Sequence, residues 1–227
     1  VTAMLNYQPS AFSKFISSFS QHPWFAPGQP GLSPSIQRTA AAAGLVVLSP
    51  ILLLVYLAIR LESKGSAIFC QQRVGKHGEE FKLYKFRSMY GADHPSHIEV
   101  QNKQSDREGV CKKHFSDPRV TPIGQIIRKL SIDELPQLLN VVKGEMALVG
   151  PRPALPQEVA VYDYKARRRL QVTPGLTGLW QVSGRADTTF EQQIDLDLRY
   201  VTRKSLLLDI NILLKTLPAV ISGRGAY

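Results

Sequence analysis

The chain has 227 residues, of which 44% are hydrophobic and 20% are charged, and its formal net charge is +10. This balance is typical of one folded domain with an appendage and excludes an intrinsically disordered chain. The positive charge predicts an anionic partner, which could be nucleic acid, an acidic lipid surface or a phosphorylated substrate. The two cysteines, Cys70 and Cys111, lack metal-ligand spacing, so we expect neither a structural zinc site nor a disulfide framework.

Residues 1–37 combine Ser, Pro, Gln and scattered aromatic residues without a sustained helical or strand period. We therefore expect a separate N-terminal segment, either lying in part at a membrane interface or remaining from a longer N-terminal region. The segment lacks the cationic start, apolar run and cleavage site of a signal peptide.

Segment 38–62 contains a long uncharged stretch, residues 39–59, with cationic residues on both sides. As a helix this stretch would extend about 31 Å, enough for the hydrocarbon core of a membrane. Ser49 and Pro50 lie at its centre, where proline removes a backbone hydrogen bond and kinks a helix. The positive-inside rule favours a cytoplasmic C-terminal flank and does not oppose a cytoplasmic N-terminal flank. These features predict a re-entrant helix broken at Ser49 and Pro50, with a kinked spanning helix as the alternative.

Residues 63–227 are expected to form one cytoplasmic domain, which begins with a short β-hairpin. Two strand-like runs, 66–74 and 81–87, flank a Gly-Lys-His-Gly turn. The period of two along a strand puts Lys85 and Arg87 on one face, where two cations could bind phosphate or form a solvated basic edge. The polar residues 89–116 predict a surface loop that could include one short helix, without chemistry.

Residues 123–130 predict a short amphipathic helix that carries Arg128 toward two adjacent acids, Asp133 and Glu134. Arg128 would pair there with a phosphate or form a surface salt bridge with one of the acids. Ser131 and Glu134 fit the Ser-x-x-Glu capping box, so both acids should lie in the first turn of the next helix. Backbone N–H groups in that turn favour negative charge, so we expect both carboxylates to stay ionised. A capping acid needs no chemistry, so spacing alone leaves a structural role open.

Arg152 lies between two prolines in a Gly-Pro-Arg-Pro loop that follows this helix. Each proline fixes its own φ and restricts the residue before it, so the Arg152 backbone has little freedom to lose when the side chain binds an anion. The acid pair and this arginine together predict an active site.

The next part of the chain predicts a helix and a glycine-rich loop. Residues 157–172 look helical, with a cationic run at 165–169 that is either a solvated face or a docking surface for anionic headgroups. Residues 174–185 predict a loop around Trp180 that fits no P-loop or dinucleotide pattern.

Two further helices are expected at the C-terminal side. Asp195 and Asp197 are two residues apart and so lie on different faces of the first helix, which argues against a paired catalytic role. The apolar run 206–221 is interrupted by charged residues and a proline, which favours an interfacial or core helix over a spanning one.

Five sequence blocks stand in order within about residues 37–222. They are Lys85-Phe-Arg-Ser-Met89, Asp117-Pro-Arg-Val-Thr-Pro-Ile-Gly124, Arg128 to Pro136, Gly150 to Pro153, and Pro174-Gly-Leu-Thr-Gly-Leu-Trp-Gln-Val-Ser-Gly-Arg185. These blocks resemble the bacterial sugar transferase family, the monotopic phosphoglycosyl transferases that act as undecaprenyl-phosphate sugar phosphotransferases. Several blocks are long enough to be highly specific.

The resemblance implies transfer of a sugar 1-phosphate from a nucleotide diphosphate sugar, commonly a UDP-hexose carrying glucose or galactose, to polyprenyl (undecaprenyl) phosphate. Such a step initiates exopolysaccharide, capsule or O-antigen synthesis. In the implied roles, Asp133 forms a covalent aspartyl phosphosugar, and Glu134 holds Mg²⁺, a hard cation that binds carboxylate and phosphate oxygens. The implied substrate contacts are Lys85, Arg87, Arg128, Arg152 and Arg185.

The predicted elements and the resemblance together give a helix-dominated α+β fold: a small membrane-associated catalytic domain with one re-entrant helix and a short β-hairpin. The implied location is the bacterial inner membrane, with the catalytic domain on the cytoplasmic face. The partners are a nucleotide diphosphate sugar, polyprenyl phosphate and membrane lipids, without nucleic acid and with a homo-oligomer left open. Two other classes compete: a membrane-tethered protein that binds anionic polymer, which leaves the acid pair unexplained, and a non-catalytic scaffold, which would tolerate loss of both acids.

Overall fold

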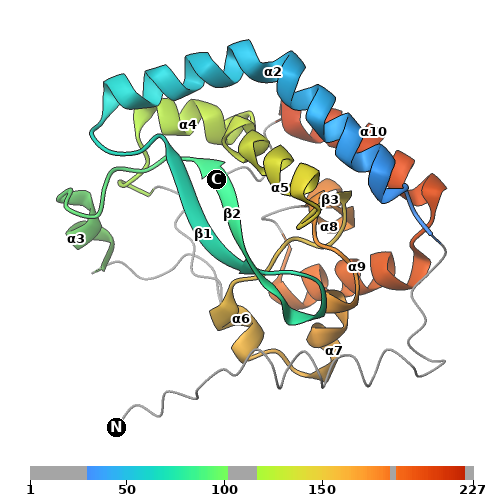
Figure 1. Cartoon of the computed structure of the whole chain (residues 1–227). Helices are drawn as coiled ribbons and strands as arrows, with labels where there is room; N and C mark the ends of the chain where they lie inside the picture. The colour runs from blue at the N-terminus through green and yellow to red at the C-terminus, as the bar shows by residue number, and fades with distance from the viewer. Residues whose placement is uncertain (1–29, 102–116, 185–187, 223–227) are drawn as a thin grey trace, which may run out of the picture.

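A computed structural model describes residues 30–101, 117–184 and 188–222 (Figure 1). Its first elements are α2 (Pro34–Glu62), β1 (Ile68–Val74), η2 (Lys76–Gly78), β2 (Glu80–Phe86) and α3 (Ser96–Gln101). The next are α4 (Pro122–Lys129), η3 (Ile132–Gln137), α5 (Leu138–Lys143), β3 (Ala147–Val149), α6 (Pro156–Ala160) and α7 (Tyr164–Arg167). The last are η4 (Arg168–Gln171), β4 (Gly175–Thr177), α8 (Leu179–Val182), α9 (Phe190–Arg203) and α10 (Leu206–Ser222). The fold is helix-dominated with a small hairpin, as predicted, and most of the predicted segment 1–37 lies outside the described residues.

α2 is one continuous helix of 29 residues that includes Ser49 and Pro50. Pro50 has no N–H to donate to the Val46 carbonyl, but the Ser49 hydroxyl donates to that carbonyl at 2.7 Å. The helix therefore bends near its middle without being interrupted (Figure 1). The predicted break at this pair is corrected to a bend, because the serine supplies the hydrogen bond that the proline removes.

The inner face of α2 packs on the rest of the domain, and its outer face is apolar and exposed. Ala41 packs in a cluster with Phe81 and Leu138, and Ile59 packs in a second cluster with Phe86. The exposed side chains are Val46, Val47, Ile51, Leu53, Leu54, Tyr56, Leu57 and Leu61. Within the ranges that the structure describes, α2 alone is long and apolar enough to cross a membrane, judged by length and composition.

The start of α2 is held by the same domain that holds its end. Before the helix, the Leu32 N–H donates to the Asp209 carboxylate at 2.8 Å, and the Gln37 side-chain carbonyl accepts from the Leu148 N–H at 2.7 Å. At the other end, the Glu62 carboxylate accepts from the backbone N–H of Ile123 at 2.8 Å. Both ends of α2 are therefore fixed to one body.

The predicted hairpin is confirmed: β1 and β2 pair antiparallel, with Ile68 opposite Phe86. A second sheet of two parallel strands, β3 and β4, was not predicted, because three-residue strands show no usable period. Its strands bring the backbones of Gly150 and Gly175 so close that a Cβ on Gly175 would lie 2.0 Å from the Gly150 nitrogen. Glycine at these positions therefore lets the loop that carries Arg152 approach the loop at Gly175.

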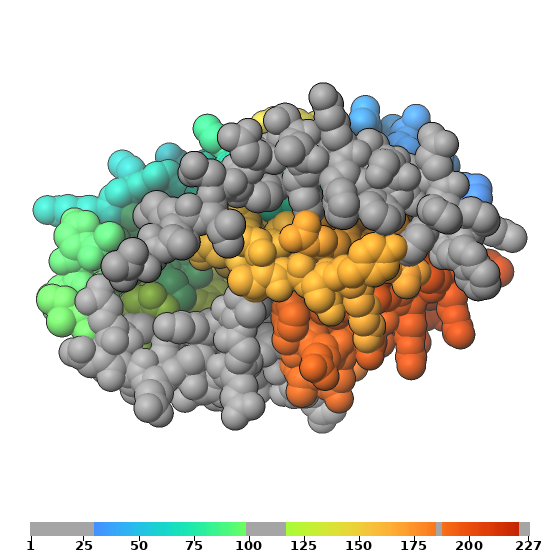
Figure 2. Space-filling model, turned by 90° about the horizontal axis from the view of Figure 1, so that it is seen from below, coloured from blue at the N-terminus to red at the C-terminus, as the bar shows by residue number. Residues whose placement is uncertain are grey.

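The face of the molecule away from α2 is covered in its centre by α6, α7 and α9 (Figure 2). The single helix predicted over 157–172 is wrong, because the chain forms α6, α7 and η4 instead. A new helix start is set at Asp163, whose side chain accepts from the Ala166 N–H at 2.7 Å.

The helix predicted over 206–221 is confirmed as α10. It buries Asp209 and Ile212 and exposes an apolar face. The exposed side chains are Leu206, Leu207, Ile210, Leu214, Leu217 and Ile221.

Candidate active site

The acid pair lies in η3, a 3₁₀ turn that precedes α5, and not in the first turn of one long helix. Ser131 has a left-handed backbone with φ 54°, and its side chain makes no capping hydrogen bond. The predicted capping box is therefore wrong, because an N-cap residue needs an extended backbone for its hydroxyl to reach the N–H of the first turn.

Asp133 lies in an environment that disfavours its charged form. Burial raises the pKa of the Asp133 carboxyl to about 7, and the adjacent Glu134 carboxylate adds to the rise. The charges of Lys85, Arg128 and Arg152 oppose the rise without cancelling it. The environment of Asp133 thus favours the neutral carboxyl more than an ordinary aspartate site does, which disagrees with the expectation that both acids stay ionised. A single 3₁₀ turn supplies little of the helix dipole on which that expectation relied, so burial outweighs it.

Arg152 faces the acid pair, as expected. Its guanidinium donates to the Glu134 carboxylate at 3.3 Å, and its Cζ atom lies 5.9 Å from the centre of the Trp180 ring. Pro151 and Pro153 flank it in the loop after β3. The arginine is therefore placed between a carboxylate and an aromatic face, with a backbone that the prolines restrict.

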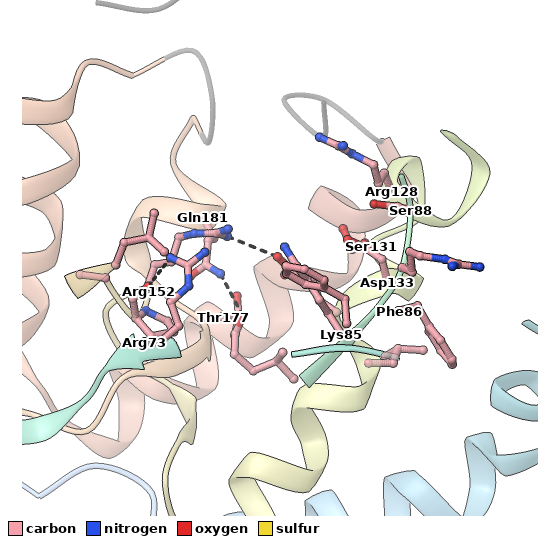
Figure 3. A pocket seen from close by; sticks show the side chains of 18 of the residues that line it. Arg73, Lys85, Phe86, Ser88, Arg128, Ser131, Asp133, Arg152, Thr177 and Gln181 are labelled. Carbon is pink, nitrogen blue, oxygen red and sulfur yellow. Dashed lines mark hydrogen bonds and ion pairs between the residues drawn. The ribbon is translucent and has the colours of Figure 1, made fainter. Parts of the chain in front are cut away.

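Lys85 and Arg128 approach the acids from two other elements. Lys85 lies on β2, where burial, together with the charges of Arg152 and Arg73, lowers the pKa of its ammonium to about 8. Arg128 lies at the end of α4, and among the described residues no ion pair joins it to either acid. The surface salt bridge considered for Arg128 is thus not observed. In Figure 3, Arg73 and Arg152 lie on one side of the pocket, and Arg128 and Asp133 lie on the other.

Arg87 has a structural role that the strand pattern did not indicate. Its guanidinium donates to the carbonyls of Lys64 and Ser63, the latter at 2.8 Å, and to the Ser63 hydroxyl at 3.0 Å. These acceptors follow the C-terminus of α2, where helix carbonyls have no intrahelical partner. Arg87 also lines the same cavity as Lys85, so its substrate contact stays a prediction. Arg185, the other predicted substrate contact, lies outside the described residues.

These groups surround a cavity of about 840 Å³ (Figure 3). Its charged lining includes Lys85, Arg128, Asp133, Glu134 and Arg152. Its apolar lining includes Leu148, Leu176, Leu213 and Val220, the last two from α10. The cavity therefore offers cations and acids for a phosphorylated group beside a wall that suits hydrocarbon.

The sequence matches the family described as "Bacterial sugar transferase" over residues 32–223. The chain belongs to this family. It is 40% identical over 196 residues to the exopolysaccharide production protein ExoY of Rhizobium meliloti, covering 85% of this chain and 87% of that protein. It is 41% identical over 186 residues to the undecaprenyl-phosphate galactose phosphotransferase of Salmonella typhimurium, covering 81% of this chain and 39% of that protein. The undecaprenyl-phosphate glucose phosphotransferase of Komagataeibacter xylinus is 42% identical over 202 residues, with 83% and 36% covered. The protein is thus an enzyme, a sugar-phosphate transferase.

Residues after β2 form a wall of the sugar transferase cavity that sequence reasoning missed. Met89, Tyr90 and His97 line the cavity, although residues 89–116 were expected to be a surface loop without chemistry. The Tyr90 N–H donates to the Arg119 carbonyl at 2.8 Å, and a His97 ring nitrogen lies 3.1 Å from the Tyr90 carbonyl. These contacts hold the described part of this segment, residues 89–101, against the site, and no periodicity in the sequence indicates them.

The acid pair of the sugar transferase site offers carboxylate oxygens, the ligand type that Mg²⁺ prefers. The residues described contain no group of three or more His, Cys, Asp or Glu side chains that could hold a metal. Mg²⁺ does not need such a cage, because it usually takes one or two carboxylates, several waters and the phosphates of a substrate. The raised pKa of Asp133 beside Glu134 also marks a place where a further cation would favour the charged form.

The two aspartates of α9 face different partners, in agreement with their spacing. Asp195 pairs at 2.6 Å with Lys165, and both side chains are more than half exposed, at 52% and 57%. Asp197 pairs with Arg169, and both side chains are buried. The interpretation of residues 165–169 as one solvated or lipid-facing cationic run is therefore wrong for Arg169.

Proposed function

We propose that this sugar transferase moves a sugar 1-phosphate from a nucleotide diphosphate sugar, most simply a UDP-hexose, to polyprenyl (undecaprenyl) phosphate, and so initiates exopolysaccharide, capsule or O-antigen synthesis. The observation that carries the proposal is the pair Asp133 and Glu134 in a cavity lined by cations and by apolar side chains. The names of the relatives from Salmonella typhimurium and Komagataeibacter xylinus support an undecaprenyl-phosphate acceptor. A basic surface for nucleic acid is less favoured, because Lys85 and Arg152 line a cavity and do not form an open stripe.

In the first half-reaction, a carboxylate oxygen of Asp133 attacks the phosphorus that bears the sugar. A new bond forms between that oxygen and phosphorus, and the bond to the nucleoside monophosphate breaks, so the monophosphate leaves with the bond's electron pair. The product is an aspartyl phosphosugar, an acyl phosphate of the kind that carboxylate nucleophiles form. Lys85, Arg128 and Arg152 would bind the diphosphate oxygens, since guanidinium groups match phosphate geometry.

In the second half-reaction, a phosphate oxygen of the acceptor attacks the same phosphorus. The bond to Asp133 breaks, the carboxylate is regenerated, and the sugar leaves as a lipid-linked diphosphate. Bound Mg²⁺, held by Glu134 and phosphate oxygens, would supply neutralisation of the substrate charge. The first isoprene units of the acceptor would lie on the apolar wall that includes Leu213 and Val220 of α10.

We also propose that α2 is a re-entrant helix in the bacterial inner membrane, with the catalytic domain on the cytoplasmic face. A helix of 29 residues would be about 44 Å long, so a straight spanning helix would put its ends on opposite sides of the hydrocarbon core. Both ends of α2 are instead fixed to the same domain, at Leu148 and at Ile123. The bend at Pro50 and the exposed apolar face are consistent with a helix that enters and leaves on one side.

Cysteine labelling tests this topology in a variant that lacks the native Cys70 and Cys111. Cysteines placed at Ser35 and at Lys64, one near each end of α2, should both react with a membrane-impermeant reagent in inverted vesicles and neither in intact cells. A cysteine at Leu54, on the exposed apolar face of α2, should be shielded in both preparations. Labelling of only one end in intact cells would support the spanning alternative.

The proposed nucleophile predicts an unusual pH dependence. Because Asp133 must be ionised to attack and its pKa is raised to about 7, kcat/KM for nucleotide release should fall about tenfold per pH unit below that pKa. An aspartate with an ordinary pKa would stay ionised down to about pH 4. Raising the Mg²⁺ concentration should move the acid limb to lower pH, since a bound cation favours the carboxylate. A flat rate between pH 5 and 8 at low Mg²⁺ would contradict this account.

The proposed function is tested by turnover of the detergent-solubilised chain with undecaprenyl phosphate, Mg²⁺ and a panel of UDP-hexoses. We expect lipid-linked diphosphate sugar and nucleoside monophosphate in equal amounts, and loss of both on chelation of the metal. No product from any nucleotide diphosphate sugar would contradict the proposal and would favour a non-catalytic scaffold or a polymer-binding protein.

A further inference from the structure

The loop that carries Arg152 is held through its backbone by two other arginines. Arg169 of η4 donates from Nη2 to the carbonyl of Arg152 at 3.0 Å. Arg73 of β1 donates from Nη1 to the carbonyl of the next residue, Pro153, also at 3.0 Å. Two successive carbonyls are thus bound by guanidinium groups from two different elements.

Both of these arginines are buried, Arg169 with 3% and Arg73 with 8% of its surface exposed. Arg169 is fixed in turn by the Asp197 carboxylate and by the Tyr162 hydroxyl, which lies 2.8 Å from Nη1. Arg73 donates to the Gln71 side chain at 2.7 Å. Burying guanidinium groups carries a large desolvation cost, and a buried ion pair is weak evidence of added stability. Added stability therefore does not explain why these two arginines are buried. Their hydrogen bonds to backbone carbonyls indicate instead that they hold the loop in a defined position.

The position of the loop matters because the Arg152 guanidinium lies at the end of a long side chain. Where the guanidinium lies therefore depends on where the loop backbone lies. Its flanking prolines restrict the φ and ψ angles of the loop but do not fix where the loop lies relative to η3. Backbone N–H groups of Gly175 and Val74 donate to the carbonyls of Pro151 and Ala154 at 2.8 and 2.9 Å and hold the two ends of the loop. The two arginine contacts hold the carbonyls between them, so that the Arg152 guanidinium reaches Glu134 at 3.3 Å and lies near the Trp180 ring. A displacement of about 1 Å at a catalytic group can cost on the order of 10²-fold in rate.

We propose that Arg169, with Asp197 as its fixed partner, and Arg73 are positioning residues that set Arg152 against the acid pair. The inference rests on the proposed function, in which Arg152 acts on the substrate phosphates. Arg169 and Arg73 would act through the backbone of the loop, and their loss should matter only while the Arg152 side chain is present.

A double-mutant cycle tests this dependence. Removing Arg169 alone would leave Asp197 buried and unpaired, so the test variant combines Arg169→Met with Asp197→Leu and removes both charges. We expect kcat/KM to fall about 10²-fold in the chain with Arg152, and less than about twofold further in the Arg152→Ala background. The matched control combines Lys165→Met with Asp195→Leu, an exposed pair that joins the same two regions of the chain, and should stay within about twofold of wild type.

Arg73→Met provides a second test from a different element, β1, in case thermal unfolding shows that the paired variant does not fold. It should show the same dependence on Arg152. Equal losses with and without Arg152, or no loss with Arg152 present, would overturn the inference while leaving the proposed function intact. An Arg152→Ala chain with full activity would also overturn it. Absence of any turnover in the wild-type chain would overturn the proposed function and, with it, this inference.

Discussion

Asp133→Asn should abolish turnover, with kcat at least about 10⁴-fold below wild type, because an amide cannot replace the carboxylate as nucleophile. The exchange keeps the size of the side chain. It also removes a carboxyl whose charged form burial disfavours, as the rise of its pKa to about 7 indicates. We therefore expect thermal unfolding at pH 8 to occur at an equal or higher temperature than in wild type. Activity and stability are measured on the same detergent-solubilised preparation.

The matched control for this exchange is Asp195→Asn. Asp195 is an exposed acid that pairs with Lys165 on the surface, so its loss should leave activity near the wild-type value. Substantial residual turnover in Asp133→Asn, at a level within tenfold of Asp195→Asn, would contradict the assignment of the nucleophile.

Arg152→Ala should lower kcat/KM by about 10²–10³-fold, which corresponds to about 2.7–4 kcal/mol of transition-state stabilisation. Arg152→Lys should recover only part of this loss, because an ammonium cannot reproduce the two-pronged contact of a guanidinium with phosphate. Steady-state rates at several donor concentrations separate the effect on kcat from the effect on KM.

The control for the arginine is Arg203→Lys at the exposed end of α9, where the same exchange should be neutral. If Arg152→Lys were as active as Arg203→Lys, a bidentate contact at Arg152 would be excluded. Its guanidinium would then serve mainly to balance the Glu134 charge.

Local sequence rules predicted the elements that depend on neighbouring residues. The uncharged run around Ser49 and Pro50 predicted α2, and the strand pattern on both sides of the Gly-Lys-His-Gly turn predicted the β1–β2 hairpin. The short helix predicted to carry Arg128 is confirmed as α4, which covers Pro122–Lys129. In each case the signal and the structure lie within the same stretch of chain.

Sequence reasoning failed or was incomplete where a distant contact decides the local structure or role. The strand pattern around Arg87 did not indicate that its guanidinium binds carbonyls at the end of α2. Arg169 belongs to a cationic run, but Asp197 and the Arg152 carbonyl hold it in the interior. The Ser-x-x-Glu spacing at Ser131 suggested a helix cap, although the left-handed backbone there prevents it. Spacing along the chain cannot supply this information, because each contact depends on where another segment lies.

The candidate site likewise combines features that neighbouring residues indicate with features that depend on distant segments. Asp133, Glu134 and Arg152 were found from a motif, and the structure brings them together at one cavity with Lys85 and Arg128. The raised pKa of Asp133 could not be predicted, because it results from burial by several segments.

The covalent intermediate is tested most directly by intact mass. The purified chain is incubated with Mg²⁺ and a uridine diphosphate sugar, without lipid acceptor, and its mass is compared with that of Asp133→Asn treated in the same way. The account predicts an adduct of one phosphosugar on the wild-type chain, none on Asp133→Asn, and loss of the adduct when undecaprenyl phosphate is added. An adduct that persists in Asp133→Asn, or acceptor-dependent release of uridine monophosphate without any adduct, would contradict the aspartyl intermediate.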